Sequence, residues 1–391
     1  MTIANSIGMV LAALVILIAC GWLWFEAKFR SRPGNLLEIT SGEWDLAIYE
    51  PDHYRLVGEL ELINHTQRFE VMVPELKADA TLLSKGSLDN VSTHLRVISC
   101  HPDAPAREDG YWFAYIVKRI PTRLQIVLEI RGEDLAALQS AWVRVRCITY
   151  GPGGRVPKIR HVIVPLQFPA VEDSQRWRPT AIADVLPIRT HLLTHLDNPV
   201  EVVRRYVLPH AQPGDVVTIG ETPLALMQGR FRHPTEVHPG WLAKRLCYFF
   251  LPTSSLATAC GLQTLVDVVG AWRVFYAFAI GAIAKKFLNK PGVFYQLAGE
   301  QARLIDDVTG TLPPYDQFIV LGPQNPQQVV EQIQQETGLS AAIVDANDLK
   351  AVKILAATSG LSEKFLEQAL ITNPAGNADE QTPVVLIRPT T

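Results

Sequence analysis

The sequence predicts an α+β protein of three parts: an N-terminal transmembrane helix, an antiparallel β-sandwich domain and a mixed α/β domain. Three observations support this class. Residues 1–25 carry no charge, residues 34–170 alternate apolar and polar side chains, and residues 317–344 have the pattern of a strand, a helix and a strand. The predicted boundaries are 5–27 for the helix, 34–170 for the β-sandwich and 187–391 for the α/β domain.

The apolar segment at the N-terminus is long enough for one membrane span. From Ile7 to Phe25 the chain is nearly all apolar, and as a helix it would cover roughly 28 Å, close to the hydrocarbon thickness of a bilayer. Lys28, Arg30 and Arg32 follow this segment, and no basic residue precedes it. Because cytoplasmic flanks carry the excess of Lys and Arg, we expect a single-pass membrane protein with the bulk of the chain in the cytoplasm.

A signal peptide and a lipoprotein signal are the alternatives to this anchor. A signal peptide begins with a basic region, which this chain lacks. Residues 17–20, Leu-Ile-Ala-Cys, are similar to a lipoprotein processing box, but Gly-Trp-Leu-Trp-Phe follows Cys20 in place of a polar linker. The anchor is therefore the favoured interpretation.

Residues 34–170 are expected to form half-buried strands. Leu56, Leu60 and Leu62 alternate with polar side chains, and the same period recurs over residues 123–130 and 143–147. The glycines and proline at 151–154 separate the last of these runs from another apolar run, which predicts a hairpin. Several short strands at this spacing favour an immunoglobulin-like sandwich, and a small barrel is the alternative.

A polar break at residues 169–186 predicts a linker, after which helical and strand patterns mix. Within the second part, residues 317–322 and 341–344 are predicted strands. Asn325 is expected to cap the helix between them and Gly338 to end it. The strand, helix and strand are expected to form one unit.

A second apolar stretch, residues 251–288, is interrupted by Asp267 and Arg273. A membrane span requires about 20 apolar residues without charge, so we expect a buried or surface-docked helix here. A segment that lies on the membrane or re-enters it is the alternative.

Composition excludes several classes of function. A net charge of −3 and an isoelectric point near 6.4 provide no broad basic face, so nucleic acid is not an expected partner. The five cysteines are odd in number and contain no Cys-x-x-Cys pair, which indicates reduced thiols, no structural zinc and no disulfide framework.

The common phosphate-binding loops are absent from the sequence, since neither Gly-x-x-x-x-Gly-Lys-Ser/Thr nor Gly-x-Gly-x-x-Gly occurs. The pairs His191 with His195 and His233 with His238 lack the spacing of a zinc protease, so structural roles are expected for these histidines.

Carboxylates that follow a predicted strand are more informative. Asp345, Asn347 and Asp348 come directly after the strand at 341–344, and ligands gather at the carboxyl ends of strands in open α/β sheets. Their oxygens suit Mg²⁺ or Mn²⁺, although a turn stabilised by side-chain caps is the favoured alternative on these residues alone. Asp306 and Asp307 form a second carboxylate pair of the same kind.

Six short segments occur in an order that resembles one enzyme family. They are Pro213-Gly-Asp-Val-Val217 with Gly229-Arg230, Lys290 to Gly299, Ile305-Asp306, Leu312-Pro-Pro-Tyr315, Ile343 to Leu349, and Asn373-Pro-Ala-Gly376 with Asp379 to Pro383. The segments together are similar to coenzyme F-420-0:L-glutamate (gamma-glutamyl) ligases and their relatives. The resemblance covers about the last 200 residues and leaves residues 1–180 outside.

The resemblance implies an amide ligation in which GTP activates a terminal carboxylate and the amine of L-glutamate attacks the resulting acyl phosphate. It further implies Mg²⁺ or Mn²⁺ as cofactor, a small-molecule carboxylate substrate or coenzyme as partner, and a homodimer. The metal-binding residues that it implies are Asp306 and Asp345, with Asn347 and Asp348 in support. The nucleotide-binding residues that it implies are Glu221, Thr222 and Arg230. No catalytic residue is assigned.

The chain departs from the family pattern at Leu226. The family motif Ser-Lys-Ala-Glu-Gly-Arg has a lysine that is expected to meet phosphate, and the matching stretch here is Ala225-Leu-Met-Gln-Gly-Arg230. Two functions follow. The retained aspartates favour a membrane-anchored ligase, whereas the leucine favours a non-catalytic member that binds a nucleotide or coenzyme, with the β-sandwich as a partner-binding module. Arg230 and Lys244 are the candidate replacements for the lost cation.

The charge bias around the apolar segment generates a test of topology. A reporter fused after Thr391 is expected in the cytoplasm, and a chain that starts at Gly34 is expected to lose most of its membrane association. Reporter activity and membrane fractionation measure the two outcomes. A periplasmic or lumenal reporter would contradict the orientation, and a shortened chain that stays with the membrane would identify residues 251–288 as a second contact.

Overall fold

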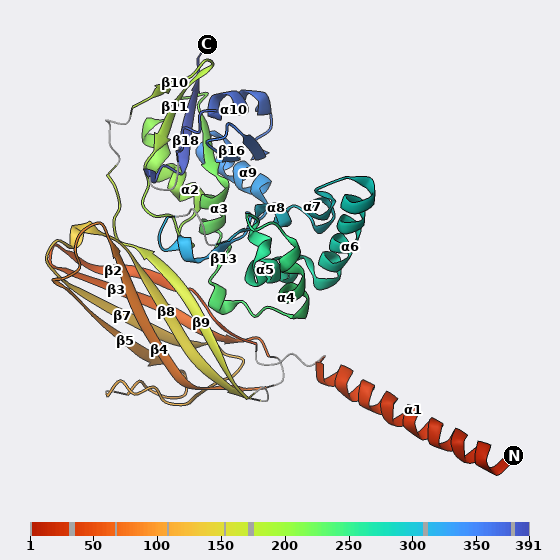
Figure 1. Ribbon diagram of the computed structural model, residues 1–391. Helices are drawn as coiled ribbons and strands as arrows, with labels where there is room; N and C mark the ends of the chain where they lie inside the picture. The colour runs from red at the N-terminus through yellow and green to blue at the C-terminus, as the bar shows by residue number, and fades with distance from the viewer. Residues whose placement is uncertain are drawn as a thin grey trace.

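The computed structural model describes residues 2–30, 36–66, 69–107, 109–151, 154–170, 176–307, 312–376 and 380–390. The chain is a mixed α+β protein with a β-rich N-terminal domain and an apolar helix at its start (Figure 1). The predicted class is confirmed at this level. A C-terminal domain lies above the β-rich domain in this view, and a lobe of helices projects from it.

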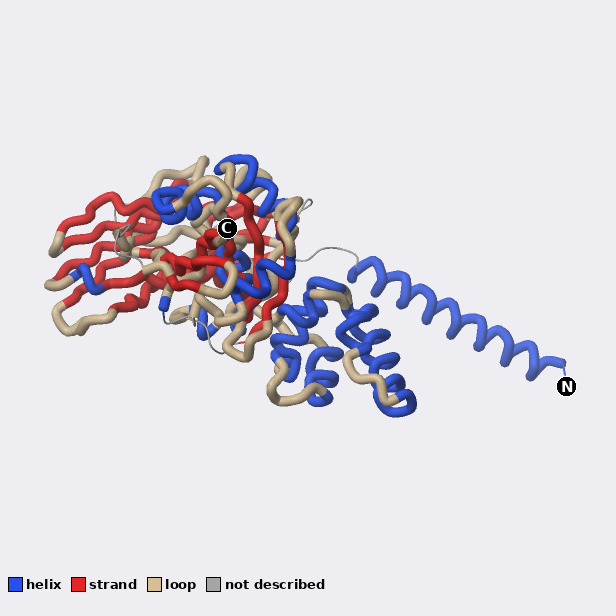
Figure 2. Tube along the Cα trace, turned by 90° about the horizontal axis from the view of Figure 1, so that it is seen from above, coloured by secondary structure: helices blue, strands red, loops and turns tan. Residues whose placement is uncertain are grey.

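The first helix, α1 (Thr2–Arg30), projects from the rest of the molecule (Figure 2). Within the described residues it is the one helix that alone has the length and hydropathy of a membrane span, and the segment that passes this test is Leu11–Lys28. No residue of the segment Leu11–Lys28 is buried; Leu17, for example, is 72% exposed. This exposure leaves the apolar side chains free to contact lipid.

The N-terminal domain contains two antiparallel sheets. The first has the strand order β1-β3-β7-β5, with β2 also paired to β3, and the second has the order β6-β4-β8-β9. The strands of the first sheet are β1 (Leu37–Ile39), β2 (Glu43–Glu50), β3 (His53–Asn64), β5 (Val91–Cys100) and β7 (Thr122–Gly132). Those of the second are β4 (Val71–Ser84), β6 (Tyr115–Val117), β8 (Leu138–Gly151) and β9 (Gly154–Pro165).

Alternating side chains of both sheets form one hydrophobic core. Leu56, Leu60 and Leu128 from the first sheet lie in the same buried cluster as Val143 and Val145 from the second. These are positions at which the sequence predicts inward-facing residues. The predicted hairpin is also confirmed, since β8 and β9 are antiparallel neighbours.

The C-terminal domain is built on a six-stranded mixed sheet with the order β10-β11-β18-β12-β16-β17. Its strands are β10 (Arg178–Pro179), β11 (Ala183–Ile188), β12 (Val216–Gly220), β16 (Ser340–Ala346), β17 (Val352–Ala357) and β18 (Val384–Pro389). Strands β12 and β16 are parallel, and the other pairs are antiparallel. Strands β10 and β11 lie inside the stretch predicted as a linker, so the sheet of this domain begins before residue 187.

The predicted strand-helix-strand unit is wrong in one respect, because its two strands belong to different sheets. A strand, a helix and a strand do follow one another as β15 (Ile319–Val320), α9 (Pro326–Thr337) and β16. However, β15 belongs to a separate small sheet, between β13 (Phe231–Arg232) and β14 (Asp306–Asp307). The periodicity of a strand does not specify its partner, and this short strand finds its partners among residues distant in sequence.

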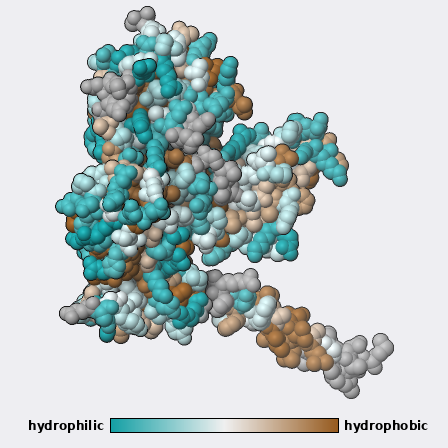
Figure 3. All heavy atoms as spheres, turned by 60° about the vertical axis from the view of Figure 1, so that its left-hand side comes forward, coloured by the Kyte–Doolittle hydropathy of each residue, from teal (hydrophilic) through white to brown (hydrophobic). Residues whose placement is uncertain are grey.

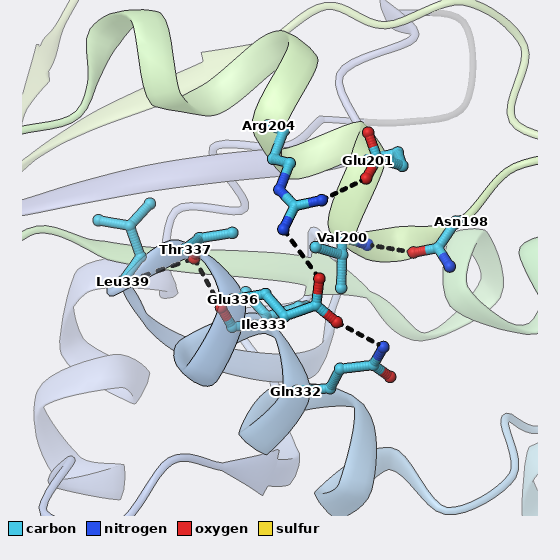
Figure 4. Close-up of polar contacts among 9 residues, drawn as sticks. All are labelled: Asn198, Val200, Glu201, Arg204, Gln332, Ile333, Glu336, Thr337 and Leu339. Atoms are coloured by element: carbon cyan, nitrogen blue, oxygen red, sulfur yellow. Dashed lines mark hydrogen bonds and ion pairs between the residues drawn. The ribbon is translucent and has the colours of Figure 1, made fainter.

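Helix α9 is held against the start of the C-terminal domain by polar contacts (Figure 4). Arg204 donates to Glu201 in its own turn and to Glu336 of α9 at 2.8 Å. Gly338 ends the helix in the left-handed conformation as predicted, whereas Asn325 occupies the cap position without a side-chain cap bond. The helix therefore fixes the start of β16, the strand that runs into Asp345.

The remaining helices of this domain lie around the sheet or form the helical lobe. Around the sheet lie α2 (Pro199–Val202), the irregular turns at Val203–Val207 and Leu208–His210, α3 (Glu221–Met227) and α10 (Glu363–Leu370). The helical lobe consists of α4 (Trp241–Leu246), the 3-10 turns η5 (Cys247–Phe249) and η6 (Ser255–Ala257), α5 (Ala259–Val269), α6 (Ala271–Leu288), α7 (Val293–Ala298) and α8 (Gln301–Leu304). Two further 3-10 turns lie at Pro234–Glu236 and Tyr315–Gln317, and one in the β-rich domain at Leu135–Ala137.

The two domains share a small apolar core. Trp142 and Ile163 of the β-rich domain pack in one buried cluster with Leu226 and Phe318 of the C-terminal domain. The Trp142 indole donates to His161 at 3.0 Å, and the His161 ring stacks on His233 at 4.4 Å between centroids. These contacts bury side chains of both domains, so the domains stabilise each other.

Phe318 provides a test of this shared core. Its side chain is 1% exposed and contacts Trp142, Phe231 and His233. Phe318→Ala is expected to lower the free energy of unfolding by about 3–5 kcal/mol, because it leaves a cavity between the domains. Urea unfolding followed by circular dichroism measures the change. Ile120→Ala, at a position 68% exposed, is the control and should cost less than about 0.5 kcal/mol. Equal effects would contradict the shared core.

Candidate functional site

The candidate site lies where two parallel strands end. In the register of β12 and β16, Gly220 is opposite Val344, so Glu221 and Asp345 are the next residues at the same edge of the sheet. Glu221 begins α3 directly after β12. The carboxyl ends of neighbouring parallel strands form the usual ligand-binding edge of an α/β sheet, and two acidic side chains meet there.

A cavity of about 350 Å³ opens at this edge. Its polar lining includes Thr218, Glu221, Asp345, Asn347, Asn373 and Gln381. Its apolar wall includes Leu192, Leu193, Leu226, Leu312 and Tyr315. Among the described residues that line it, none is Lys or Arg. The cavity is therefore a concave, largely apolar pocket with an acidic end.

The acidic side chains perturb one another. Burial, together with the charges of Asp345, Asp306 and Glu300, raises the pKa of Glu221 to about 8, and the charge of Lys353 opposes this rise. Burial, followed by the charge of Asp345, also raises the pKa of Asp306. Glu221, Asp306 and Asp345 therefore lie close enough to interact although they are distant in sequence. A bound cation would relieve this repulsion.

The donor set suits a hard divalent cation in its chemistry. Carboxylate oxygens are the ligands that Mg²⁺ and Mn²⁺ prefer, and a bound cation would lower the pKa of Glu221, which burial and neighbouring charges raise. In the part of the chain that the structure describes, no three His, Cys, Asp or Glu side chains already stand close enough together to hold an ion. Side-chain rotation would have to complete the coordination.

Asn347 and Asp348 stabilise the turn after β16. The Asn347 side-chain oxygen accepts hydrogen bonds from the backbone N–H groups of Leu349 and Ala351, at 3.0 and 3.2 Å. Asp348 accepts from the Asn373 amide at 2.7 Å. Asn347 also lines the cavity, whereas Asp348 does not. Both side chains therefore stabilise the loop that follows Asp345. This is the role in a capped turn that the sequence analysis gave as the alternative to metal binding.

The residues expected to bind nucleotide separate into two places. Glu221 and Thr222 line the cavity. Arg230 does not, because its guanidinium donates to the Gly322 carbonyl at 2.5 Å and to the side chains of Gln324 and Gln301. Lys244 belongs to α4 in the helical lobe and does not line the cavity either. Neither Arg230 nor Lys244 therefore brings a positive charge to the part of the cavity wall that Leu226 forms.

Two of the four histidines in these pairs, His191 and His233, make contacts within the fold, and His191 also lines the cavity. Residues 191–195 form no helix. The His191 ring is bonded on both nitrogens, to the Tyr206 hydroxyl at 2.7 Å and to Asp197 at 2.8 Å. His233 stacks in the interdomain core, and the neighbouring Glu236 lies 3.9 Å from His161. Burial raises the pKa of Glu236 to about 6.

Sequence reasoning missed several side chains at the site. Asn373 and Gln381 line the cavity, and both belong to segments that carry the family resemblance without having been assigned a role. Lys353 pairs with Asp345 in the register of β16 and β17 and forms an ion pair with Glu300 at 3.5 Å. Its position two residues after the turn at 347–351 was the signal available in the sequence.

The fold and the site together define a β-rich domain joined to a mixed α/β domain with an acidic, ligand-sized cavity. Residues 38–168 match the family described as "F420-0:gamma-glutamyl ligase, N-terminal Ig-like domain". This match confirms the resemblance to gamma-glutamyl ligases and corrects its extent. The β-rich domain, predicted to lie outside the family, is the part that matches, because period-two alternation identifies strands without identifying a family.

Comparisons with curated proteins and with solved structures identify no further relative that supports a function. No curated protein matches the chain. A solved structure titled "AvmM Catalyzes Macrocyclization in Alchivemycin A Biosynthesis" is similar at 8% identity over 36% of this chain and 92% of that chain, with a TM-score of 0.22. A likeness at this TM-score carries no argument about fold or function.

Asp345→Asn tests whether the acidic end of the cavity binds a cation. The change removes one negative charge with little change of shape, so folding should survive while the affinity for Mn²⁺ falls about 10-fold or more. Asp348→Asn is the matched control, because it removes the same charge from a residue that does not line the cavity, and its effect should be much smaller. Calorimetric titration measures both. Equal affinities of wild type and Asp345→Asn would mean that Asp345 is a turn residue.

Proposed function

We propose that this protein is a membrane-anchored relative of the F420-0:gamma-glutamyl ligases whose C-terminal domain binds a small molecule together with Mg²⁺ or Mn²⁺. The observation that carries the proposal is the position of Glu221 and Asp345 side by side at the carboxyl ends of two parallel strands, where both line the cavity. Burial and the charges of Asp345 and Asp306 raise the pKa of Glu221 to about 8, which agrees with this geometry. A divalent cation held there by Glu221, Asp306 and Asp345 would attract a carboxylate or phosphate group of the ligand. The apolar wall would hold the rest of the molecule.

Two activities are compatible with this site. One is the amide ligation that the resemblance implies, in which glutamate is joined to a carboxylate substrate at the expense of GTP; the retained aspartates favour it. The other is binding without turnover. The described lining residues contain no Lys or Arg, and Leu226 stands where the family has lysine. A triphosphate carries several negative charges, so these residues do not fit it, and binding without turnover is favoured.

The side chains of the cavity suggest how a ligand would be held. Amides of Asn373 and Gln381 can donate to or accept from a polar group, and Thr218 adds a hydroxyl deep between the strands. The Asn373 amide already donates to Asp348, which fixes its orientation toward the cavity rim. Leu192, Leu312 and Tyr315 exclude water from the opposite wall. Such a pocket selects a ligand with one polar or anionic end and an apolar or aromatic body.

The remaining parts of the proposal concern location and assembly. In this account α1 anchors the chain in a membrane, the bulk of the protein lies in the cytoplasm, and the β-rich domain is an Ig-like sandwich that supports the ligase-like domain and can recruit a partner. The support is the exposed apolar surface of α1, the basic residues that follow it and the family match over residues 38–168. A homodimer is implied by the resemblance alone.

Leu226 decides between the two activities. The wild-type protein is expected to join glutamate to the deazaflavin precursor with GTP very slowly or not at all, because loss of one positive phosphate ligand typically costs a factor of ~100 to 1000 in rate. Leu226→Lys should strengthen GTP binding about 10-fold, since its stem can cover the apolar wall while the ammonium faces the cavity. Equilibrium binding of GTP and product formation measure the two effects.

Leu226→Met is the matched control, because it keeps the volume and adds no charge. Urea unfolding of all three proteins shows whether the lysine disrupts the apolar cluster in which Leu226 packs with Trp142. If the wild-type protein ligates glutamate at ordinary enzyme rates, binding without turnover is ruled out and another residue must supply the positive charge.

A further inference from the structure

We propose that the part of the helical lobe before α8, residues 237–299, docks on an anionic lipid bilayer through the exposed aromatic face of α6 and the neighbouring turn η5. This inference rests on the proposed membrane location of the chain. It assigns a second, peripheral contact to a surface that neither the cavity nor the interdomain core uses. The contact would lie in the headgroup layer and would not cross the bilayer.

Helix α6 buries its small side chains and exposes its large ones. The residues that it buries are Val274, Ala277, Gly281 and Ala284. Its exposed apolar residues are Trp272, Phe275, Tyr276, Ile280, Ile283, Phe287 and Leu288. An added Cβ at Gly281 would lie only 3.0 Å from the Phe294 backbone nitrogen, so α7 already packs closely on the small face. A helix in water normally has the opposite arrangement, which indicates that the outer face contacts something apolar.

The apolar surface continues beyond α6. Tyr248 and Phe249 of η5 are 85% and 72% exposed, and the Phe249 ring contacts Phe278 of α6 at 5.4 Å between centroids. Trp241 at the start of α4 and Leu251 after η5 are each 69% exposed. Large aromatic side chains of this kind favour the membrane–water interface, where their rings meet both lipid and water.

The charge of the lobe identifies the kind of surface that it would meet. The whole chain has a net charge of −3, yet between residues 237 and 299 there are six basic residues and one acidic residue. The basic residues are Lys244, Arg245, Arg273, Lys285, Lys286 and Lys290, and all six are exposed. The acidic residue, Asp267, is paired with Arg232 at 2.7 Å. Exposed cations beside aromatic rings attract anionic headgroups, whereas a second copy of the same lobe would be repelled.

The geometry favours a contact with the membrane surface over a span. The chain bends by 114° between α5 and α6, so the two helices do not form one straight membrane span. The lobe and α1 project from the same side of the molecule in the ribbon and tube views, and Figure 3 shows the hydrophobic surface of α1 below the lobe on that side. A chain anchored through α1 therefore brings the lobe near the same bilayer, and its high local concentration there favours a weak contact.

Lipid quenching of a site-attached fluorophore tests the proposal on the full chain. The fluorophore is attached at Tyr276→Cys, or at Ile120→Cys in the β-rich domain as a control, after Cys20 and Cys100 are changed to serine; both probe positions are exposed. The protein is reconstituted in bilayers of phosphatidylcholine with and without phosphatidylserine, which contain lipids with a nitroxide near the headgroup. The same protein without an added cysteine supplies the background.

The probe at position 276 is expected to be quenched at least about 3-fold more than the probe at position 120, and more strongly when phosphatidylserine is present. Lys285→Glu combined with Lys286→Glu should remove the dependence on phosphatidylserine while the protein stays in the bilayer. Equal quenching at 276 and 120 in protein that floats with the bilayer would overturn the docking surface and leave the anchor intact. A probe at 276 that is shielded from water but not quenched would assign the face to a protein contact and also overturn the proposal. Protein that does not float at all would overturn both the anchor and the docking.

Discussion

The arrangement of the site depends on the parallel pairing of β12 with β16. That pairing brings Glu221 and Asp345 to one edge of the sheet, and the small sheet of β13, β15 and β14 brings Asp306 toward them. Carboxylates that lie near one another repel, and burial together with the charges of Asp345 and Asp306 raises the pKa of Glu221. The fold maintains the arrangement because the strands beneath it are fully buried. Carboxylates that repel one another in this way are typical of a ligand-binding site.

The second constraint is the apolar core between the domains. Leu226 faces the cavity on one side and packs in the cluster of Trp142 and Phe318 on the other. Leu226 is thus also part of the contact that joins the β-rich domain to the C-terminal domain. A positive charge at this position would have to be accommodated in the apolar cluster of Trp142, so an apolar residue here and the packing of the two domains are physically linked. Helix α9, fixed through Arg204 and Glu336, packs on the six-stranded sheet in the same buried cluster as Leu224 and Met227 of α3.

Much of the fold could be predicted from the sequence, because period-two alternation and an uncharged segment are local patterns. The core positions Leu56, Leu128 and Val143 follow directly from them. Pairing could not be predicted, since β15 joins residues distant in the chain. The position of Asp345 after a strand could be predicted from the sequence, whereas the orientation of Arg230 could not, because its bond to the Gly322 carbonyl spans 92 residues. The aromatic face of α6 is visible in the sequence only as hydrophobicity, and its exposure emerges from the packing of α7 on the small face.

The central claim is that the carboxylates at the strand ends form a cation-dependent site, and the protonation of Glu221 tests it most directly. Infrared difference spectra between wild type and Glu221→Gln, recorded as a function of pH, isolate the carbonyl band of the protonated Glu221 side chain. The account predicts an apparent pKa of about 8 for Glu221 without cation. It also predicts a marked decrease of that pKa when Mg²⁺ or Mn²⁺ is added, because the cation stabilises the ionised form. A Glu221 pKa in the ordinary range near ~4.3, unaffected by either cation, would contradict the account.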